Sequence, residues 1–340
     1  MSKPKDIAHE NAEKEIDALT KRFQSIYSQA NREVQEKLNN YLERFKKQDE
    51  AMLKKMENGN ITQDEYQKWY QNRVFAGKQW RARLDALAED YTHANQLAMN
   101  AVNGALLEVY ADNFNYAAYL TEQQVRADLS FQLVDRWTVE RLARDNPQLL
   151  PAPSVNIPKD KRWNRQKIMS AVTQGIIQGE SMQKIARRLK KVTDMNAASA
   201  IRNARTAVTG AECAGRVDSY KVAEIKGVQM VQVWRATLDS RTRHSHAAID
   251  GEEIEPGGTF SNGCQYPGDP HGEPSDVYNC RCTILGHVKG YEKYHQRGAY
   301  GNGKLGDESY DEWKARHSAE FEKSSKSNQI PLTNITTKTV

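Results

Sequence analysis

The sequence predicts an α+β protein, in which a long helical hairpin at the N-terminus and a helical connector are followed by a small loop-rich α+β C-terminal domain. Over most of the first half of the chain, apolar residues recur every three or four positions with charges between them, which is the spacing of one helix face. After residue 227 the pattern changes to a short apolar run and then to a stretch rich in glycine and proline. The chain has 340 residues, more than one hydrophobic core normally serves, so we expect more than one structural unit.

Composition favours long amphipathic helices over a thick globule. Hydrophobic residues make up 38% of the chain and charged residues 27%, and the mean hydropathy is −0.82, so the apolar stripes must be narrow. The chain has no apolar run long enough for a membrane span and no apolar segment of a signal peptide near its start. We therefore expect a protein that is neither inserted in a membrane nor exported by a conventional signal. The formal net charge of +5 is only mildly basic and identifies no class of partner.

Residues 1–146 are expected to form a helical arm for assembly. An apolar stripe begins at Ile16 and stops at Asn58-Gly59-Asn60, which predicts one long helix. The sequence Thr62-Gln-Asp-Glu65 then has the form of a capping box, so a second long helix is expected to begin there. A tight turn between two long helices predicts an antiparallel hairpin. A third helical stretch is expected at Glu122–Arg144.

The aromatic residues of this hairpin have two interpretations. They are either the internal seam of the hairpin, which we prefer, or a surface that docks against a partner helix, because a two-helix hairpin alone buries little apolar area. The residues concerned are Tyr66, Trp69, Tyr70 and Trp80.

A proline-rich linker at residues 147–160 separates the arm from a basic helical connector at residues 161–227. Prolines break the helical pattern in the linker. In the connector we expect two short helices, Arg162–Gly179 and Ser181–Lys191, and a longer alanine-rich helix, Met195–Ala223, that ends near a glycine suited to the C-cap.

Residues 228–290 are expected to form a β-rich unit and residues 291–340 a short helix with a disordered tail. Val228–Trp234 has the composition of a strand, and Asp250–Gly272 that of a loop. A short charged helix is expected near Glu308–Lys323, and the polar residues after it are typical of disorder.

Several short motifs follow one another in the β-rich unit. The chain reads WRATLDSRTRHSHAAIDGEE from Trp234, then Pro-Gly-Asp-Pro at 267–270 and Asn-Cys-Arg-Cys at 279–282. In this order the motifs resemble the C-terminal domain of the Mu F-like phage head morphogenesis family, over Met195–Leu285. The matched positions are Asp239, Arg241, Thr242, Arg243, His246, Asp250, Gly251, Pro267, Asp269, Pro270, Asn279, Cys280, Arg281 and Cys282.

The resemblance implies a minor capsid protein of a tailed double-stranded DNA phage. Such a protein is expected to associate with the portal protein, and with the scaffold and major capsid proteins as further partners, in prohead assembly and in DNA packaging or ejection. Its expected place is the interior of the virion head near the portal, with assembly in the host cytoplasm. Some relatives carry an additional C-terminal toxin domain, for which the stretch after the motif leaves too little room, so we expect no enzyme activity.

Histidines and cysteines are concentrated in the same unit. Zinc accepts thiolate and imidazole ligands tetrahedrally, and a small unit with few apolar residues commonly needs such a staple. The C-x-C and H-x-H spacings argue against this, since alternate residues of a strand face opposite ways. In the alternative, the C-x-C pair is one buried thiol and one exposed thiol. The cluster comprises His244 and His271 together with our candidate zinc ligands His246, Cys264, Cys280 and Cys282.

A catalytic interpretation of this stretch is a metal-dependent nuclease or toxin, in which Asp239, His244, His246 and Asp250 bind a divalent ion. A Cys280 nucleophile with His246 as its base is another version. No known signature accompanies either version. We prefer a structural interpretation, in which the residues that begin at Asp239 form a polar turn whose side chains hydrogen-bond their own backbone and nearby carboxylates.

The connector carries a strong local charge. Lys159–Lys191 holds ten basic residues against two acidic residues, Asp160 and Glu180. Such a helix surface favours nonspecific contact with double-stranded DNA, or with an acidic surface on a portal or scaffold partner, although charged faces are often merely solvated. The candidate contact residues are Lys184, Arg187, Arg188, Lys190 and Lys191.

Overall fold

The computed structural model describes residues 6–73, 78–147, 149–150, 153–178, 180–290, 304–305 and 308–327. The chain divides into two compact units, each assembled from separate segments. Unit 1 comprises Met1–Glu15, Ala105–Pro151 and Arg205–Val340, and unit 2 comprises Ile16–Gly104 and Ala152–Ala204. Three long helices contribute residues to both units: α1 (Ile7–Glu57), α3 (Lys78–Val125) and α6 (Met182–Ile225). The units therefore follow packing, whereas the segments expected from the sequence follow the order along the chain.

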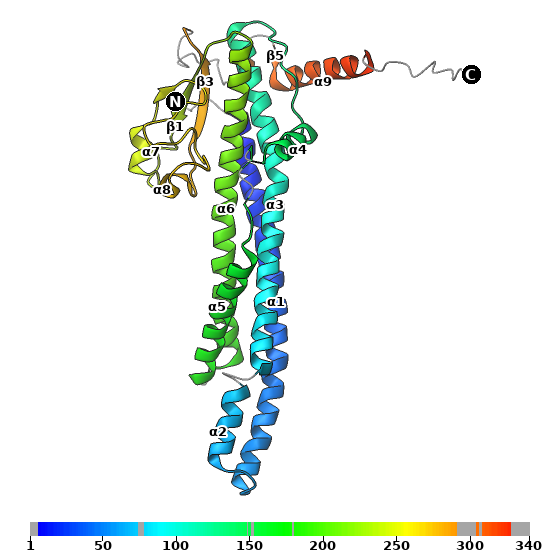
Figure 1. The fold of residues 1–340 in the computed structure, drawn as a ribbon, viewed down its shortest axis with the longest axis vertical. Helices are drawn as coiled ribbons and strands as arrows, with labels where there is room; N and C mark the ends of the chain where they lie inside the picture. The colour runs from blue at the N-terminus through cyan, green and yellow to red at the C-terminus, as the bar shows by residue number, and fades with distance from the viewer. Residues whose placement is uncertain are drawn as a thin grey trace, which may run out of the picture. The chain divides into compact units, whose positions relative to one another are not determined.

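The antiparallel hairpin is confirmed within unit 2. Helices α1 and α3 lie side by side, and residues paired between them run in opposite directions along the chain (Figure 1). The hydroxyl of Tyr27 donates to Asn95 at 2.8 Å, and the ammonium of Lys37 lies 2.8 Å from the Asp90 carboxylate. Apolar side chains of both helices are buried between these polar contacts.

Two described helices stand where a single long helix was expected from Thr62, and residues 74–77 between them lie outside the described residues. The capping box at Thr62 is present and starts α2 (Gln63–Gln71), but α3 begins only at Lys78. The hydroxyl of Tyr41 donates to the backbone carbonyl of Arg73, so that carbonyl has a side-chain partner where the chain leaves α2. A tertiary contact of this kind is invisible to the sequence pattern.

The aromatic residues form an internal seam, as preferred from the sequence. Trp80 is fully buried, and Tyr66 is buried with its hydroxyl 2.8 Å from Asp49. The rings of Phe45 and Trp69 stack with their centroids 5.9 Å apart. These contacts attach α2 to the end of α1.

Helix α5 (Ile157–Ile177) starts earlier than predicted, inside the expected proline linker. Asn156 caps it by accepting the N–H of Lys159 at 3.1 Å, and Pro158 occupies its first turn. A proline is well suited to that position because the N–H that it lacks would have no helical partner. Part of the predicted linker is therefore helix.

The basic connector contains one continuous helix, α6, where two helices separated near residue 193 were expected. The hydroxyl of Thr193 donates to the Leu189 carbonyl at 3.3 Å, and Lys190 pairs with Asp194 at 2.8 Å. Thr193 and Asp194 thus have hydrogen-bonding or ion-pair partners on the helix itself, and the helix continues through them. At its other end Gly227 adopts φ = 88°, as predicted for a C-cap.

The predicted helix Glu122–Arg144 is wrong. Helix α3 ends at Val125, Arg126 adopts φ = 53°, and α4 (Arg136–Asp145) begins after the cap Asp135. The buried carboxylate of Glu122 accepts the N–H of Leu129 at 2.9 Å and so holds the intervening loop.

The C-terminal domain contains the predicted small sheet, which confirms the α+β class. Strand β1 (Met230–Arg235) is central and pairs antiparallel with β2 (Glu253–Ile254) and β3 (Thr283–Val288), in the order β2-β1-β3. The sheet lies beside α6 (Figure 1). A Cβ on Gly286 would lie 2.4 Å from the ring of Tyr220, so the absence of a side chain there lets α6 approach β3. The short helices α7 (His244–Ala248) and α8 (Pro274–Val277) lie in the connections.

Helix α9 (Tyr310–Ser327) confirms the last predicted helix and extends it by a turn. It follows the two-stranded sheet β4 (Lys304–Leu305) and β5 (Glu308–Ser309). The indole of Trp313 is fully buried and donates to Glu122 at 2.6 Å, which attaches α9 to α3. The rest of the predicted tail lies outside the described residues. Among the helices that the structure describes, none is long and apolar enough to cross a membrane.

Candidate functional site

The predicted motif residues gather in unit 1, on the connections between its three main strands. The polar turn at Asp239–Arg243 follows β1, His246 lies on α7, and Asp250 and Gly251 precede β2. The segment Asn279–Cys282 leads directly into β3. Folding thus brings together residues that are distant along the chain.

Asp239 and Arg281 join two of these connections. The guanidinium Nη2 lies 2.6 Å from Asp239 Oδ1, and Nη1 bonds the second carboxylate oxygen. Asp239 also accepts the N–H of Arg241 at 2.9 Å and the hydroxyl of Thr242 at 3.3 Å. The Arg281 guanidinium holds the pKa of Asp239 well below its usual range. The interpretation of this segment as a polar turn is confirmed.

Helix α6 holds the Asn279–Cys282 segment through two threonines. Thr206 Oγ1 accepts the N–H of Asn279 at 2.8 Å, and the Thr209 hydroxyl donates to the carbonyl of Cys280 at 3.2 Å. Asn279 adopts φ = 58°, a conformation that asparagine tolerates better than most residues. The cysteines therefore stand on irregular backbone that is fixed from the helix side.

The Pro267–Pro270 turn packs against the same helix. Gly268 adopts φ = 81°, and a Cβ there would lie 2.6 Å from the backbone nitrogen of Gly210 on α6. Asp269 is buried and accepts two backbone N–H groups of its own loop, at 2.8 and 2.9 Å. This motif is thus explained by close backbone packing and loop closure.

Asp250 and Gly251 close the turn before β2. The carboxylate of Asp250 accepts the N–H of Ala236 at 2.9 Å, and Gly251, at φ = 85°, donates its N–H to the carbonyl of Trp234 at 2.9 Å. Arg243 reaches the carbonyl of Tyr278 in the opposite connection. Most of the polar motif residues thus fix one loop to another.

A buried cluster of His246, Cys280 and Cys282 is the exception. The His246 Nδ1 atom lies 3.5 Å from Cys280 Sγ and 3.4 Å from Cys282 Sγ, and the three side chains are almost entirely buried. On the other side of the imidazole, Nε2 lies 3.3 Å from Asp276 Oδ1. Trp234 packs edge to face against the imidazole, with centroids 5.2 Å apart. This arrangement can bind a thiophilic divalent metal ion.

The two thiols of the cluster have pKa values shifted in opposite directions. The hydrogen bond from Cys280, together with His246, lowers the pKa of Cys282 to about 5. The same bond and burial raise the pKa of the Cys280 thiol.

The strand-alternation argument against the Cys-x-Cys pair is wrong. Both cysteines precede β3, which begins at Thr283, so the alternation of a strand does not apply to them. The N–H of Cys282 lies 3.4 Å from Cys280 Sγ, and both sulfur atoms face His246. The alternative of one buried and one exposed thiol is also wrong, because both cysteines are buried.

The other candidate ligands are not part of this cluster. Cys264 is buried, but its sulfur lies beside Gly272 and is not in the metal-binding group. His244 is exposed, and His271 is exposed with its ring against Asp269. Half of the six histidines and cysteines in this stretch are therefore brought together.

The residues of the catalytic interpretation do not converge. Among the described residues, no metal-binding group contains Asp239, His244 or Asp250. Cys280 and His246 do meet, but each is only 1% exposed, which closes the sulfur to a macromolecular substrate.

Sequence reasoning missed Asp276 and a buried charge network around Arg216. Asp276 precedes the motif in an unremarkable Pro-Ser-Asp sequence, and only the fold places it beside His246. Arg216 is 1% exposed and bonds Asp6, Asn113 and the carbonyl of Ile284. An arginine four residues after Glu212 on an alanine-rich helix face was a usable signal.

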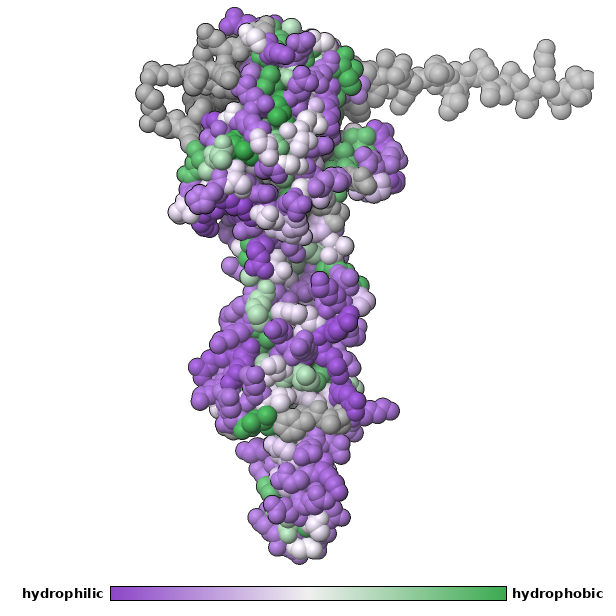
Figure 2. All heavy atoms as spheres, turned by 60° about the vertical axis from the view of Figure 1, so that its left-hand side comes forward, coloured by the Kyte–Doolittle hydropathy of each residue, from purple (hydrophilic) through white to green (hydrophobic). Residues whose placement is uncertain are grey.

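The positive charge of Lys159–Lys191 is partly neutralised by ion pairs inside unit 2. Four of the ten basic residues in this stretch form ion pairs with described residues. Two of these four are candidate contact residues: Arg188 is half-buried and lies 2.7 Å from Glu180, and Lys190 pairs with Asp194. Lys184, Arg187 and Lys191 stay exposed. Figure 2 shows that hydrophilic side chains predominate on the visible face of the unit 2 helices.

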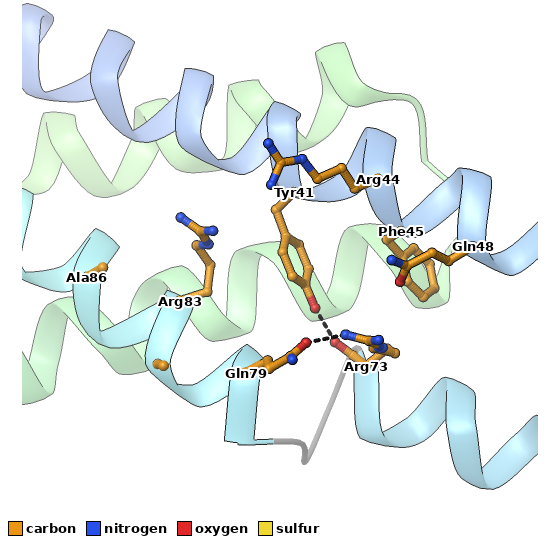
Figure 3. A pocket seen from close by; sticks show the side chains of 9 residues that line it. Tyr41, Arg44, Phe45, Gln48, Arg73, Gln79, Arg83 and Ala86 are labelled. Atoms are coloured by element: carbon orange, nitrogen blue, oxygen red, sulfur yellow. Dashed lines mark hydrogen bonds between the residues drawn. The ribbon is translucent and has the colours of Figure 1, made fainter.

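Unit 2 also contains a cavity of about 420 Å³ lined by α1, by the first turns of α3 and by Arg73 (Figure 3). Its lining includes three arginines, and Arg83 lies over the ring of Tyr41, 5.8 Å from the centroid. Arg73 is bonded to Gln79, so part of this polar lining is internally satisfied. None of the motif residues lines the cavity. The lining residues are Tyr41, Arg44, Phe45, Gln48, Arg73, Gln79, Ala82, Arg83 and Ala86.

Comparison with known proteins gives a family and two relatives. Residues 166–285 match the family described as phage Mu protein F like protein. The chain is 26% identical over 278 residues to the minor head protein GP7 of Bacillus phage SPP1, covering 79% of this chain and 82% of that protein. It is 26% identical over 216 residues to the NAD(+)–arginine ADP-ribosyltransferase EFV of Enterococcus faecalis, covering 63% of this chain but only 44% of that protein. No solved structure matches the chain.

These findings define a phage head morphogenesis protein. Residues 166–285 are similar to the Mu F-like family, which confirms the resemblance found in the motifs. The matched segment begins in α5, well before the first motif, so the helix that supports the motif loops is part of the family unit.

Proposed function

We propose that this protein is a minor capsid protein of a tailed double-stranded DNA phage, located in the virion head near the portal and active in prohead assembly. The observation that carries the proposal is the match to the minor head protein GP7 over most of both chains. Neither compact unit is as long as the 278 matched residues, so the match includes parts of both. The helical bundle of unit 2 therefore shares in the likeness, in addition to the Mu F-like segment.

The geometry of the motif supports a structural role over an enzymatic one. Asp239, Asp250 and Asp269 accept hydrogen bonds from their own loops or pair with arginine. A carboxylate so engaged is poorly available as a metal ligand or general base. The family motif in this chain is then a set of loop-fixing contacts around a small sheet.

The portal protein is the partner that we propose first. Its binding is tested by co-expressing the two proteins and measuring the mass of the purified complex by size-exclusion chromatography with light scattering. We expect a stable complex that contains both proteins. Failure to co-purify with the portal, combined with recovery on the scaffold or major capsid protein, would overturn the portal assignment and leave the head assignment standing.

Absence of catalysis is proposed as well, and the relative named as an arginine ADP-ribosyltransferase gives the sharpest test. The purified chain is incubated with labelled NAD⁺ and an arginine-rich acceptor, and separately with plasmid DNA and magnesium or manganese. We expect neither label transfer nor cleavage above background. Label transfer, or DNA cleavage that His246→Ala abolishes, would contradict a purely structural role.

A further inference from the structure

The ligand atoms of the buried cluster already have the spacing of a tetrahedral metal site. With Zn–S near 2.3 Å and Zn–N near 2.05 Å, two such ligands at a tetrahedral angle stand about 3.6 Å apart. The two observed distances from His246 Nδ1 to the sulfur atoms of Cys280 and Cys282 are 3.5 and 3.4 Å. All three ligand atoms lie within 4.8 Å of one another. One ion can contact all three after small adjustments.

The backbone around the cluster suits two thiolates. The N–H of Cys282 points to Cys280 Sγ at 3.4 Å, and the N–H of Thr237 bonds Cys282 Sγ. Such N–H contacts stabilise negative charge on sulfur. Thr209 and Thr206 on α6 fix the same segment from behind, so the sulfur atoms are held in position before an ion arrives.

The second nitrogen of the imidazole lies beside a carboxylate, as the second nitrogen of a metal-binding histidine commonly does. Asp276 Oδ1 lies 3.3 Å from His246 Nε2, and the Ser245 hydroxyl donates to the same oxygen at 2.8 Å. Nε2 makes no hydrogen bond in this geometry, and Nδ1 is the nitrogen that faces the two sulfur atoms, as a ligand atom for an ion bound there must.

We propose that His246 Nδ1, Cys280 Sγ and Cys282 Sγ bind one structural zinc ion, with the fourth position left to a non-protein ligand. Binding forms two Zn–S bonds and one Zn–N bond and releases the thiol protons to solvent. Two thiolates with an imidazole suit zinc better than magnesium or calcium, which prefer oxygen ligands. The ion would tie α7 to the segment before β3 and so staple the loops around the sheet. This proposal is independent of the portal assignment.

Metal content of the full chain tests the proposal directly. Protein purified without chelators and dialysed against a low concentration of zinc chloride is expected to hold about one zinc per chain by elemental analysis. Cys280→Ser and Cys282→Ser should each lose most of it. Cys264→Ser is the matched control, because Cys264 is equally buried yet lies outside the cluster, and it should keep its zinc. Loss of zinc in Cys264→Ser would overturn the three-ligand assignment.

A measurement on the unaltered chain guards against variants that fail to fold. Metal-free protein titrated with cobalt(II) should show a sulfur-to-metal charge-transfer band and visible bands of tetrahedral intensity, which saturate at one equivalent. Asp276→Asn should bind the ion with about 10- to 100-fold lower affinity, as expected for a partner that orients the ligand. An absent charge-transfer band, or a chain whose mass shows a Cys280–Cys282 disulfide under the same conditions, would overturn the metal site.

Discussion

Arg216 holds the carboxylate of Asp6 with two hydrogen bonds, from Nη1 at 2.6 Å and from Nη2 at 2.8 Å. The guanidinium side chain is 2% exposed, and it also donates to Asn113 and to the carbonyl of Ile284 on β3. One arginine thus links α6 to the start of α1, to α3 and to the sheet within unit 1.

Arg216→Met should therefore destabilise unit 1 strongly. The substitution removes the main cation of the mostly buried Asp6 carboxylate and a second cation near the buried Glu212, and breaking a buried pair in this way costs about 3–5 kcal/mol. Urea unfolding followed by circular dichroism measures the loss. The matched control is Lys221→Met on the same helix, whose pair with Asp218 is largely exposed and should be worth at most about 1 kcal/mol. Equal losses in the two variants would contradict the assigned role of the network.

Stability should fall on the alkaline side because of His9. Its Nδ1 lies 2.9 Å from Glu212 Oε1, and the Glu212 charge raises the pKa of His9 from 6.5 to about 9. A group whose pKa is raised by folding stabilises the fold fully below its unfolded pKa and loses that contribution as the pH rises through the folded value. The free energy of unfolding should therefore decline between about pH 6.5 and 9. In His9→Gln this decline should largely disappear, and an unchanged pH profile would show that His9 is not its source.

Gly268→Ala should cost more than Gly263→Ala. Both glycines have positive φ, 81° and 82°, so both substitutions carry the strain of about 1 kcal/mol that alanine meets there. Only at Gly268 would the new methyl group also lie 2.6 Å from the backbone of Gly210, whereas at Gly263 nothing lies within 4 Å. The difference in melting temperature between the two variants isolates the close approach of the turn to α6. Equal melting temperatures would mean that the turn can withdraw from the helix without cost.

Salt-dependent retention on double-stranded DNA should depend on the exposed basic residues of α6. Changing Lys184, Arg187 and Lys191 to glutamine should lower affinity and reduce the slope of log K against log salt by up to about 0.9 for each phosphate that is no longer neutralised. The control changes Lys21, Lys46 and Lys47 on α1, which are also exposed and alter the net charge equally. If both triple variants behave alike, net charge alone accounts for retention and the α6 surface is not a DNA-binding surface.

Local signals in the sequence were sufficient for much of the fold. The capping box at Thr62, the C-cap at Gly227 and the strand that ends near Trp234 each depend on a few adjacent residues, and each is confirmed. The end of α3 was missed, because the loop after it is held by the buried Glu122 carboxylate. That carboxylate is enclosed in part by Trp313 on α9, a partner from a distant segment that leaves no periodic trace.

The candidate site was also predicted only in part from the sequence. The composition of the motif pointed to His246, Cys280 and Cys282, but strand alternation wrongly separated the two cysteines because it assumed regular backbone. Asp276 could not be identified, since its role depends on the path of the chain through α8. Residue types were thus predictable where backbone geometry was not.

Unit 1 contains both the earliest and the latest described parts of the chain, and this has a consequence for the order of synthesis. Glu122 leaves the ribosome 191 residues before Trp313, its indole partner on α9, whereas every residue of unit 2 has been made by Ala204. The bundle of unit 2 can therefore fold while translation continues. Unit 1 must wait, with the Glu122 carboxylate hydrated, until Trp313 and Arg316 emerge to enclose it. A ribosome that stops before α9 would release a chain with one finished unit and one unfinished unit.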